Sequence, residues 1–392
     1  MFKLCRKVGR SEGRKVGRSE GRKVGRSEGR KVGRSEGPQE YNAIDLAKFI
    51  CAILVVSVHV APFGLTDNET LQLLNYGIQQ WLARIAVPFF FISSGFLLYH
   101  KSSLNNFSLD RTKLYVVKLI KLYVIWTLIY FPFKIKSILM NERGIIYGVF
   151  TYCGDIVFVG SYMQLWYFPA LIFSVVVISY LLSKKVSLKK ITAVAFCFYV
   201  MGLLTESWFG VIRPLQFNMP EFWSFLRFLK IVIFTTRDGL FEGLLFVAIG
   251  TIVAFYGFKM QQRNALIGFL VAYILMFIEA LGLKYFDFVR ARDVYLFLIP
   301  LTWFAFGFVV NHRIQSRNSV FFKTLRNLSS LIFYTHLWVK WFIVKLFSII
   351  GFEIDKTCLL FILTVSVSIA VSYVIYTMAN YEHFNVLKKL YS

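Results

Sequence analysis

His59 is the side chain in this sequence best suited to acid–base chemistry. It lies in the apolar stretch IDLAKFICAILVVSVHVAP, eleven residues after Lys48. In a helix these two residues are about 16 Å apart along the axis, and Asp45, one turn before Lys48, is close enough to pair with it. Imidazole exchanges its proton near neutral pH, so His59 can take a proton from a hydroxyl in a dry pocket. The alternative is a histidine that only hydrogen-bonds to a neighbouring helix or reaches outward.

Arg84 is the second candidate, near the start of the apolar segment LARIAVPFFFISSGFLLY. If the first segment crosses a membrane outward, this one returns inward, which places Arg84 at about the depth of His59. A buried guanidinium can hold an oxyanion or a phosphate oxygen through two hydrogen bonds. The small residues of the SSG sequence allow a neighbouring helix to approach closely. We interpret Ser94 as a supporting residue there, with simple packing as the alternative.

Two later segments add aromatic and basic groups. Trp166 lies in QLWYFPALI, at the start of a mid-chain apolar segment. The segment LSSLIFYTHLWVKWF carries His336 and Lys340 four residues apart, and hence on one face of a helix. We interpret Trp166 and His336 as supporting residues of the site, whereas Lys340 can simply extend its amine toward water.

Glu242 and Glu279 lie inside two further apolar segments. An ionisable side chain within a membrane helix costs at least ~2.5 kcal/mol, so each such residue is a functional candidate. Glu242 has two conceivable partners, Arg237 in its own turn region or a cation across the helix bundle. The sequence does not decide between them.

Composition indicates where these segments reside. The 392 residues are 57% apolar and 17% charged, with a mean hydropathy of +0.59, whereas soluble domains average roughly 45–50% apolar and about 25% charged. A helix needs about 20 mostly apolar residues to cross a bilayer. We therefore predict an all-α, polytopic membrane bundle of about ten transmembrane helices in residues 41–385. The expected spans are Ile44–Pro62, Gln80–Tyr99, Leu114–Phe133, Leu165–Ser183, Ile191–Thr205, Gly239–Gly257, Ala265–Leu283, Val294–Val310, Leu331–Ile350 and Cys358–Met378.

Orientation follows from the distribution of basic residues. With both termini in the cytoplasm, the cytoplasmic loops carry fifteen Lys and Arg residues against eleven in the outer loops, which agrees with the positive-inside rule. Two apolar segments, Ile145–Gly160 and Phe222–Thr236, are too short or too charged to span. We expect both to be re-entrant or interfacial pieces.

The N-terminal 40 residues are of a different kind. Arg6 to Gly37 are four copies of the octapeptide RKVGRSEG, with one valine as the only apolar residue in each. So little apolar surface cannot offset the entropy of ordering, and we expect disorder. The tail is either an electrostatic tether to anionic lipid or an expanded coding repeat without function.

Charge and cysteine usage exclude several classes of function. The net charge of +24 includes +8 from the tail, and the rest is spread over short loops. Because no basic face of a soluble domain results, nucleic acid is not an expected partner. The five cysteines form neither a CxxC pair nor a Cys/His cluster, so neither a metal site nor a disulfide framework is expected.

Four of these segments together resemble the acyltransferase-3 family of integral membrane acyltransferases. The opening IDLAKF…HV is similar to the family's Asp, basic residue and His pattern, and RIAVPFFFISSGFLL is very like its arginine and "PlFFxxSGF" stretch. QLWYFPALI and SSLIFYTHLW are similar to two further family segments, in the same order. The first two motifs are the specific ones.

The resemblance implies a ten-helix bundle in the bacterial cytoplasmic membrane that moves an acyl group, usually acetyl from acetyl-CoA, onto a hydroxyl of an envelope or exported glycan. His59 then matches the essential histidine and Arg84 the second-helix arginine. Lys48 stands where the family usually has arginine, which keeps the charge for a donor phosphate but loses the planar fork. His59 is expected to act as general base, or to carry the acetyl group itself.

Two other functions fit the same segments. One is a membrane transporter or solute-binding module, since vancomycin-resistance serine racemases carry a similar membrane domain; this chain stops at Ser392, without a racemase portion. A transporter is expected to show two related halves, and no internal repeat is evident in the membrane region. The other is a structural partner in the assembly of an envelope polysaccharide.

Overall fold

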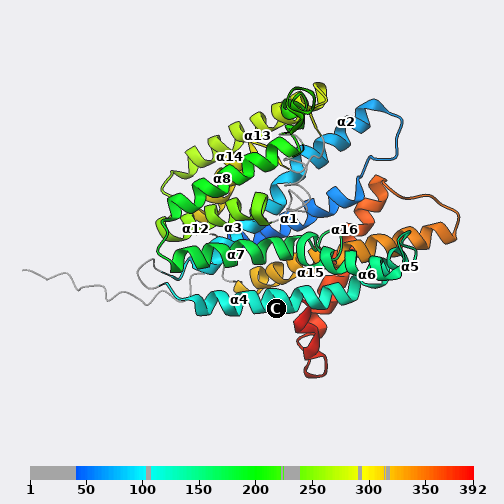
Figure 1. The fold of residues 1–392 in the computed structure, drawn as a ribbon. Coiled ribbons are helices and arrows are strands. Elements are labelled where there is room, and N and C mark those ends of the chain that lie inside the picture. The colour runs from blue at the N-terminus through cyan, green and yellow to red at the C-terminus, as the bar shows by residue number, and fades with distance from the viewer. Residues whose placement is uncertain are drawn as a thin grey trace, which may run out of the picture. The chain divides into compact units, whose positions relative to one another are not determined.

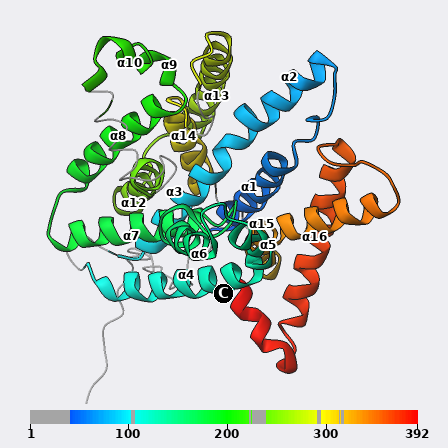
Figure 2. The same ribbon diagram turned by 45° about the vertical axis from the view of Figure 1, so that its right-hand side comes forward.

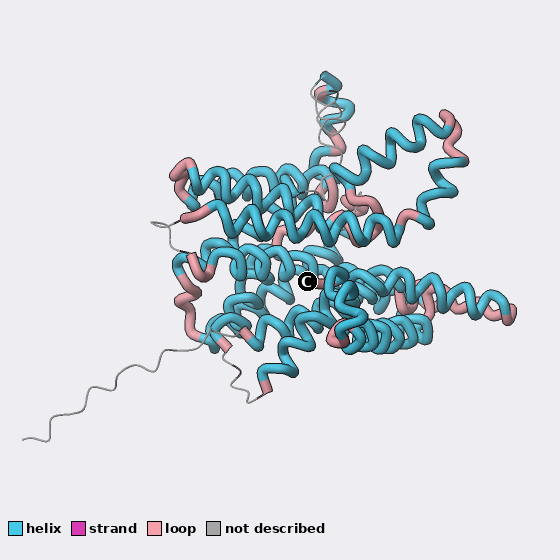
Figure 3. The backbone as a smooth tube through the Cα atoms, turned by 90° about the horizontal axis from the view of Figure 1, so that it is seen from below, coloured by secondary structure: helices cyan, strands magenta, loops and turns pink. Residues whose placement is uncertain are grey.

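The computed structural model describes residues 41–392 apart from 103–106, 222–223, 225–238, 290–293, 313 and 315–317. The predicted disordered tail (residues 1–40) and nearly all of the predicted interfacial piece at Phe222–Thr236 therefore lie outside the described residues. Within the described part of the chain every regular element is a helix and there is no strand, as Figure 3 shows. The all-α prediction is confirmed.

The elements follow one another as helices joined by short turns. Their bounds are α1 (Asn42–Val60), α2 (Glu69–Gly77), η1 (Ile78–Leu82), η2 (Ala83–Ile85), α3 (Ala86–Tyr99), α4 (Leu109–Tyr130), α5 (Pro132–Leu139), α6 (Ile145–Gly154), η3 (Asp155–Val159), α7 (Tyr167–Ser183), α8 (Leu188–Thr205), α9 (Phe209–Ile212), α10 (Leu215–Asn218), η4 (Gly239–Gly243), α12 (Leu244–Tyr256), α13 (Gln262–Tyr285), α14 (Leu298–Asn311), α15 (Ser319–Ile349), α16 (Cys358–Met378) and η5 (Glu382–Leu390).

Side-chain caps account for several helix starts. The side chains of Asn68, Ser187, Asn318 and Thr357 each accept a hydrogen bond from a backbone N–H three residues onward. Such caps satisfy an N–H group that has no partner within the helix. The polar residues between the apolar stretches thus define where the long helices begin.

Six helical stretches are long and apolar enough to cross a membrane: α1, the stretch α2–α3, α8, α13, α15 and α16. A seventh results if α4 and α5, which meet at a bend of 64°, form one span. Helices α7, α12 and α14 coincide with predicted spans but are shorter. A membrane-spanning helical architecture is therefore found, whereas the count of ten spans and the cytoplasmic placement of both termini stay predictions.

The packing order brings the predicted site segments together. Helix α1 packs most extensively against α15, and α3 against α12, while α4 lies along α7 (Figure 1). The chain then returns through α16, and the end of η5 reaches α4, where the Trp126 indole N–H donates to the carbonyl oxygen of Leu390 at 3.0 Å (Figure 2). Helix α1 also packs against α3, and α3 contacts α7, so α1, α3, α7 and α15 lie next to one another.

Close approach of α3 and α12 depends on two glycines. A Cβ added at Gly95 would lie 2.4 Å from the backbone oxygen of Val247, and one at Gly250 would lie 2.1 Å from that of Ile92. Neither neighbour can yield without moving a helix backbone. The tight packing that the SSG sequence suggested is therefore present at Gly95, as small residues allow in membrane helices.

We predict that Gly95→Ala destabilises the protein. Overpacking of a filled interface costs typically 1–3 kcal/mol, and a rigid carbonyl as the opposing group favours the upper end, about 3 kcal/mol. The unfolding midpoint of the purified chain in detergent, followed by intrinsic fluorescence, measures this effect. Gly282→Ala in α13 is the matched control, because a Cβ there meets no atom within 4 Å. Equal midpoints for both variants would contradict the prediction.

Candidate functional site

A cavity of about 100 Å³ collects four of the candidate polar side chains. His59 comes from α1, Arg84 from η2, Trp166 from the turn before α7, and Glu242 from η4. The remaining wall is apolar, with Val55, Val58, Ala83, Val87 and Met163. An imidazole, a guanidinium, a carboxylate and an indole thus converge on one small space from four separate elements.

Irregular helical geometry marks two of these positions. Arg84 lies in a 3₁₀ turn directly after the π-helical segment η1, and Glu242 lies in the π-helical segment η4. Single π-helical turns inside longer helices occur frequently at functional sites. His59 is in the last turn of α1, and the residue that follows the helix, Ala61, has a left-handed backbone with φ of 54°.

His59 lies against a second histidine. The ring centroids of His59 and His336 are 5.2 Å apart. His336 is fully buried; its Nδ1 is 3.0 Å from the carbonyl oxygen of Ile332, and its Nε2 has no hydrogen-bond partner among the residues that the structure describes. One turn further, the Lys340 ammonium donates to the backbone oxygen of His59 at 3.0 Å and lies 3.4 Å from Asp355. Helix α15 therefore holds the end of α1 in place.

Arg84 is oriented from its own helix. Its Nε–H donates to Oε1 of Gln80 at 3.1 Å, and the hydroxyl of Tyr295 donates to the same oxygen at 3.2 Å. Gln80 is buried. A buried amide with two donors on one oxygen fixes the guanidinium that borders the cavity.

The two buried glutamates have different environments. Glu279 accepts hydrogen bonds from the Trp208 indole at 2.7 Å and from the backbone N–H groups of Leu296 and Phe297 at 2.8 and 2.9 Å. It anchors the turn before α14. Glu242 instead borders the cavity with Arg84 and His59. The sequence marked Glu242 only by the cost of a carboxylate in an apolar segment, and the fold adds its location.

A second, larger cavity of about 730 Å³ extends along the same helices toward Lys48. Its wall is rich in cations: Lys48, Lys101, Arg111, Lys118 and Arg326. His100 also lines it, and burial lowers the pKa of this imidazole below its ordinary value, so the ring is neutral at pH 7. The positive charge therefore comes from lysine and arginine alone.

Asp45 does not pair with Lys48 as the spacing suggested. Its carboxylate, with 3% of the side chain exposed, accepts two hydrogen bonds from Arg326, at 2.8 Å from Nε and 2.6 Å from Nη2. The residues are 281 positions apart, so only the packing of α1 on α15 joins them. Lys48 is left to line the larger cavity.

We predict that Arg326→Met markedly lowers stability. Removing Arg326 leaves the buried Asp45 carboxylate without its partner, and loss of one partner of a buried pair costs about 3–5 kcal/mol. Because the Arg326 side chain is 48% exposed, we expect a loss at the lower end, about 3 kcal/mol. The unfolding midpoint measures the loss. Lys113→Met is the control: its pair with Asp110 is 3.8 Å long and largely exposed, and such pairs contribute at most about 1 kcal/mol. A stability equal to that of the control would show that Asp45 does not need this partner.

Ser94 and Trp166 occupy the region between the cavities. The hydroxyls of Ser94 and Tyr167 are 3.1 Å apart, and both residues line the larger cavity. Trp166 borders the smaller one. Gly160, at φ 99°, lets the chain turn so close that a Cβ there would lie 2.4 Å from the Trp166 backbone nitrogen.

The predicted residues thus fall into three groups. His59, Arg84 and Trp166 border the smaller cavity, and Lys48 and Ser94 line the larger one. Asp45 and His336 line neither cavity: Asp45 binds Arg326 of the larger cavity's wall, and His336 packs against His59. Among the residues that the structure describes, no group of three or more His, Cys, Asp and Glu side chains is placed to hold a metal ion.

Such an arrangement suits a reaction between a phosphorylated ligand and a group that loses a proton. Cations in the larger cavity can bind phosphate, and the imidazole in the smaller one can accept a proton. Arg84 beside it can stabilise a negative oxygen.

Comparison with known proteins supplies the relatives. The chain is 28% identical to an amino-acid racemase of Enterococcus faecalis over 283 residues, which are 72% of this chain and 37% of that protein. It is 30% identical to a serine/alanine racemase of Enterococcus gallinarum over 271 residues, 69% of this chain and 37% of that protein. The chain thus matches little more than a third of the length of these relatives. No solved structure matches the chain.

A match to a family model assigns the chain to a protein family. The model described as an acyltransferase domain (acyltransferase-3) matches residues 41–377, which is most of the chain. The same residues hold the smaller cavity and nearly all of the long apolar helices, and they line the larger cavity except at Tyr391 and Ser392. This chain belongs to the acyltransferase-3 family of multi-pass membrane proteins.

Proposed function

We propose that this protein transfers an acetyl group from acetyl-CoA to a hydroxyl of a cell-envelope or exported glycan. The observation that carries the proposal is the pair of cavities on shared helices, one basic and large, the other small and built around His59 and Arg84. Residues 41–385 act as one membrane domain in the bacterial cytoplasmic membrane, with both termini in the cytoplasm.

The larger cavity is the donor site. Acetyl-CoA is a cytoplasmic anion, and in the proposed orientation the Lys48 end of α1 faces the cytoplasm. Lys48, Lys101, Arg111 and Lys118 line this cavity and bind the donor phosphates through charge-assisted hydrogen bonds. Lys48 and His59 are about 16 Å apart along the helix, a distance that the extended pantetheine arm bridges.

His59 activates the acceptor. As the acceptor oxygen attacks the thioester carbonyl, imidazole removes the hydroxyl proton, a C–O bond forms, and Arg84 stabilises the negative oxygen. The C–S bond then breaks, and the CoA thiolate takes the proton back from the imidazolium. In a variant route the imidazole nitrogen first attacks the thioester carbonyl, the C–S bond breaks, and CoA leaves as the thiol with the imidazole proton. The acceptor hydroxyl then displaces the acetyl group from the imidazole and gives its proton back to the ring.

Acetyl transfer in membranes tests the proposal. Membranes from cells that express the full chain receive radiolabelled acetyl-CoA, and label is followed into envelope carbohydrate beside membranes with an empty vector. Label above the vector control is the expected result. Label no higher than the control, in the presence of verified protein, contradicts the acetyltransferase proposal.

A second function is a solute-binding or transport module for an amino acid. Similarity to proteins named amino-acid racemase and serine/alanine racemase favours this candidate. Vesicles from the same cells, supplied with radiolabelled serine or alanine, distinguish it: protein-dependent accumulation without acetyl transfer would establish transport in place of acylation.

A further inference from the structure

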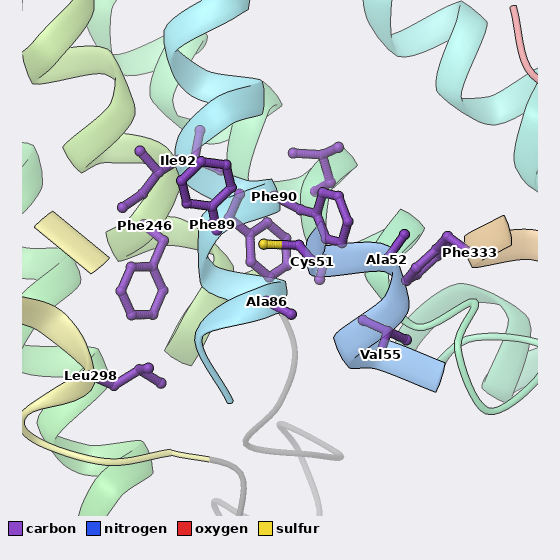
Figure 4. Close-up of a cluster of buried hydrophobic side chains, with 14 of the residues drawn as sticks. Cys51, Ala52, Val55, Ala86, Phe89, Phe90, Ile92, Phe246, Leu298 and Phe333 are labelled. Atoms are coloured by element: carbon purple, nitrogen blue, oxygen red, sulfur yellow. The ribbon is translucent and has the colours of Figure 1, made fainter. Parts of the chain in front are cut away.

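Three aromatic rings from three helices meet in the wall of the larger cavity. The rings belong to Phe90 of α3, Tyr167 of α7 and Phe333 of α15. The ring centroid of Phe90 is 6.3 Å from that of Tyr167 and 5.9 Å from that of Phe333, and the centroids of Tyr167 and Phe333 are 5.7 Å apart. At these separations aromatic rings are in contact. Figure 4 shows Phe90 and Phe333 among the buried side chains of this region.

The helices that line one cavity continue into the other. On the α2–α3 stretch the lining residues recur every three or four positions, as one helix face requires: Ala83 and Val87 border the smaller cavity, then Phe90, Ser94, Leu97 and Lys101 border the larger. Phe90 is thus the first residue of this face on the larger cavity.

Two other segments lead from the larger cavity to the surroundings of His59. On the chain leading into α7, Trp166 borders the smaller cavity and Tyr167 the larger. On α15, Phe333 lines the larger cavity, while His336, less than one turn further, lies against His59. All three rings thus line the larger cavity, one helical step or less from residues that border the smaller cavity or contact His59.

We propose, on the basis of the acyltransferase function above, that Phe90, Tyr167 and Phe333 form the partition between the two cavities and act as a filter for the size of the acyl group. A donor held in the larger cavity reaches His59 only by passing its thioester end between these rings. The acyl group must then occupy the cavity of about 100 Å³, which also has to admit the acceptor hydroxyl. A two-carbon acyl group can pass between the rings and leave room for the acceptor hydroxyl, and each added methylene makes both more difficult.

The partition is built to stay narrow. Phe90 and Phe333 are both buried, with 7% and 6% of their surface exposed, so neighbouring side chains restrict their rotation. The hydroxyl of Tyr167 is tied to that of Ser94 at 3.1 Å. Removing one ring is expected to widen the passage while the phosphate-binding end stays unchanged.

Donor competition in membranes tests this filter. Membranes that contain the full chain receive radiolabelled acetyl-CoA or butyryl-CoA, and initial rates of label entering envelope carbohydrate are compared as a ratio. Wild type is expected to use acetyl-CoA at least tenfold faster. Phe90→Leu and Phe333→Leu are each expected to raise the butyryl-to-acetyl ratio at least tenfold, because leucine keeps the packing but lacks the ring.

Phe96→Leu is the matched control. Phe96 is also a buried ring of α3, packed against Phe306, but lies outside the cavity walls. An unchanged ratio in this variant, with raised ratios in the other two, supports the filter. Wild type that uses both donors equally, ring variants with the wild-type ratio, or a Phe96→Leu ratio raised as much as theirs would each overturn it.

The same experiment separates failure of the filter from failure of the acyltransferase function. If wild type transfers acetyl but the ratios contradict the filter, only the filter is lost. If wild type transfers no acyl group from any donor, both are lost. Monodisperse size-exclusion profiles of all three leucine variants, and CoA binding within twofold of wild type, show that a changed ratio reflects the passage and not a damaged fold.

Discussion

His59→Gln is expected to reduce acetyl transfer to near the level of membranes that lack the protein. Glutamine fills much of the imidazole volume but cannot accept a proton from the acceptor hydroxyl. General-base help is worth about 10²–10⁴ in rate, and if His59 also carries the acetyl group, its loss closes that route as well. The measurement is label entering envelope carbohydrate from radiolabelled acetyl-CoA, at matched protein levels.

A second histidine provides the control. His312 follows α14 directly, is exposed, lies 2.7 Å from the Gln262 side chain, and belongs to the wall of neither cavity. His312→Gln is expected to transfer acetyl at the wild-type rate. CoA binding is expected to be unchanged in His59→Gln, because the donor phosphates bind at the other end of α1. A His59→Gln protein as active as wild type would remove His59 from the mechanism.

Hydropathy alone predicted much of the helical framework. Each of the ten stretches predicted to span coincides with a helix within the described residues, because a long apolar run is most stable when its backbone hydrogen bonds are internal. The number of spans could not be predicted equally well from the sequence. Helix α14 holds only fourteen residues, and a break at Phe131 bends α4 away from α5. Where a helix ends depends on turns and packing that composition does not encode.

The predicted depth of each residue in the membrane was the most informative quantity for locating the site. His59 lies at the end of the first apolar helix and Arg84 near the start of the next apolar stretch, so an antiparallel pair places them at one level; the structure brings both to one cavity. Pairings between distant helices were beyond the sequence. Asp45 has a candidate partner one turn away in Lys48, yet it binds Arg326, because the packing of α1 on α15 decides which cation faces the carboxylate.

Irregular geometry was also hidden. Nothing in the residues around Arg84 or Glu242 announces a π-helical turn, since such turns arise when packing favours one extra residue in a helix. The proposed partition of three rings could not be predicted from the sequence for a similar reason. Phe90 and Phe333 belong to phenylalanine-rich segments in a chain with 42 phenylalanines, and only the fold distinguishes two rings on a passage from rings that face lipid or core.

Lys48→Met is expected to weaken CoA binding by about tenfold or more. A hydrogen bond to a charged group contributes about 1.5–3 kcal/mol, which corresponds to a factor of roughly 10 to 100 in affinity. Lys48→Arg is expected to bind at least as well as wild type, because the guanidinium offers phosphate a planar pair of donors. The dissociation constant for CoA, measured on the purified full chain in lipid nanodiscs, checks both variants.

The salt dependence of binding shows whether Lys48 acts through its charge. Screening weakens phosphate–lysine attraction as ionic strength rises, so the dissociation constant of Lys48→Met is expected to change less with salt than that of wild type. Lys121→Met is the control, since Lys121 is an exposed cation of α4 outside the cavity wall. Affinity lost equally in both variants would assign the effect to overall surface charge, and wild-type affinity in Lys48→Met would place the donor phosphates elsewhere.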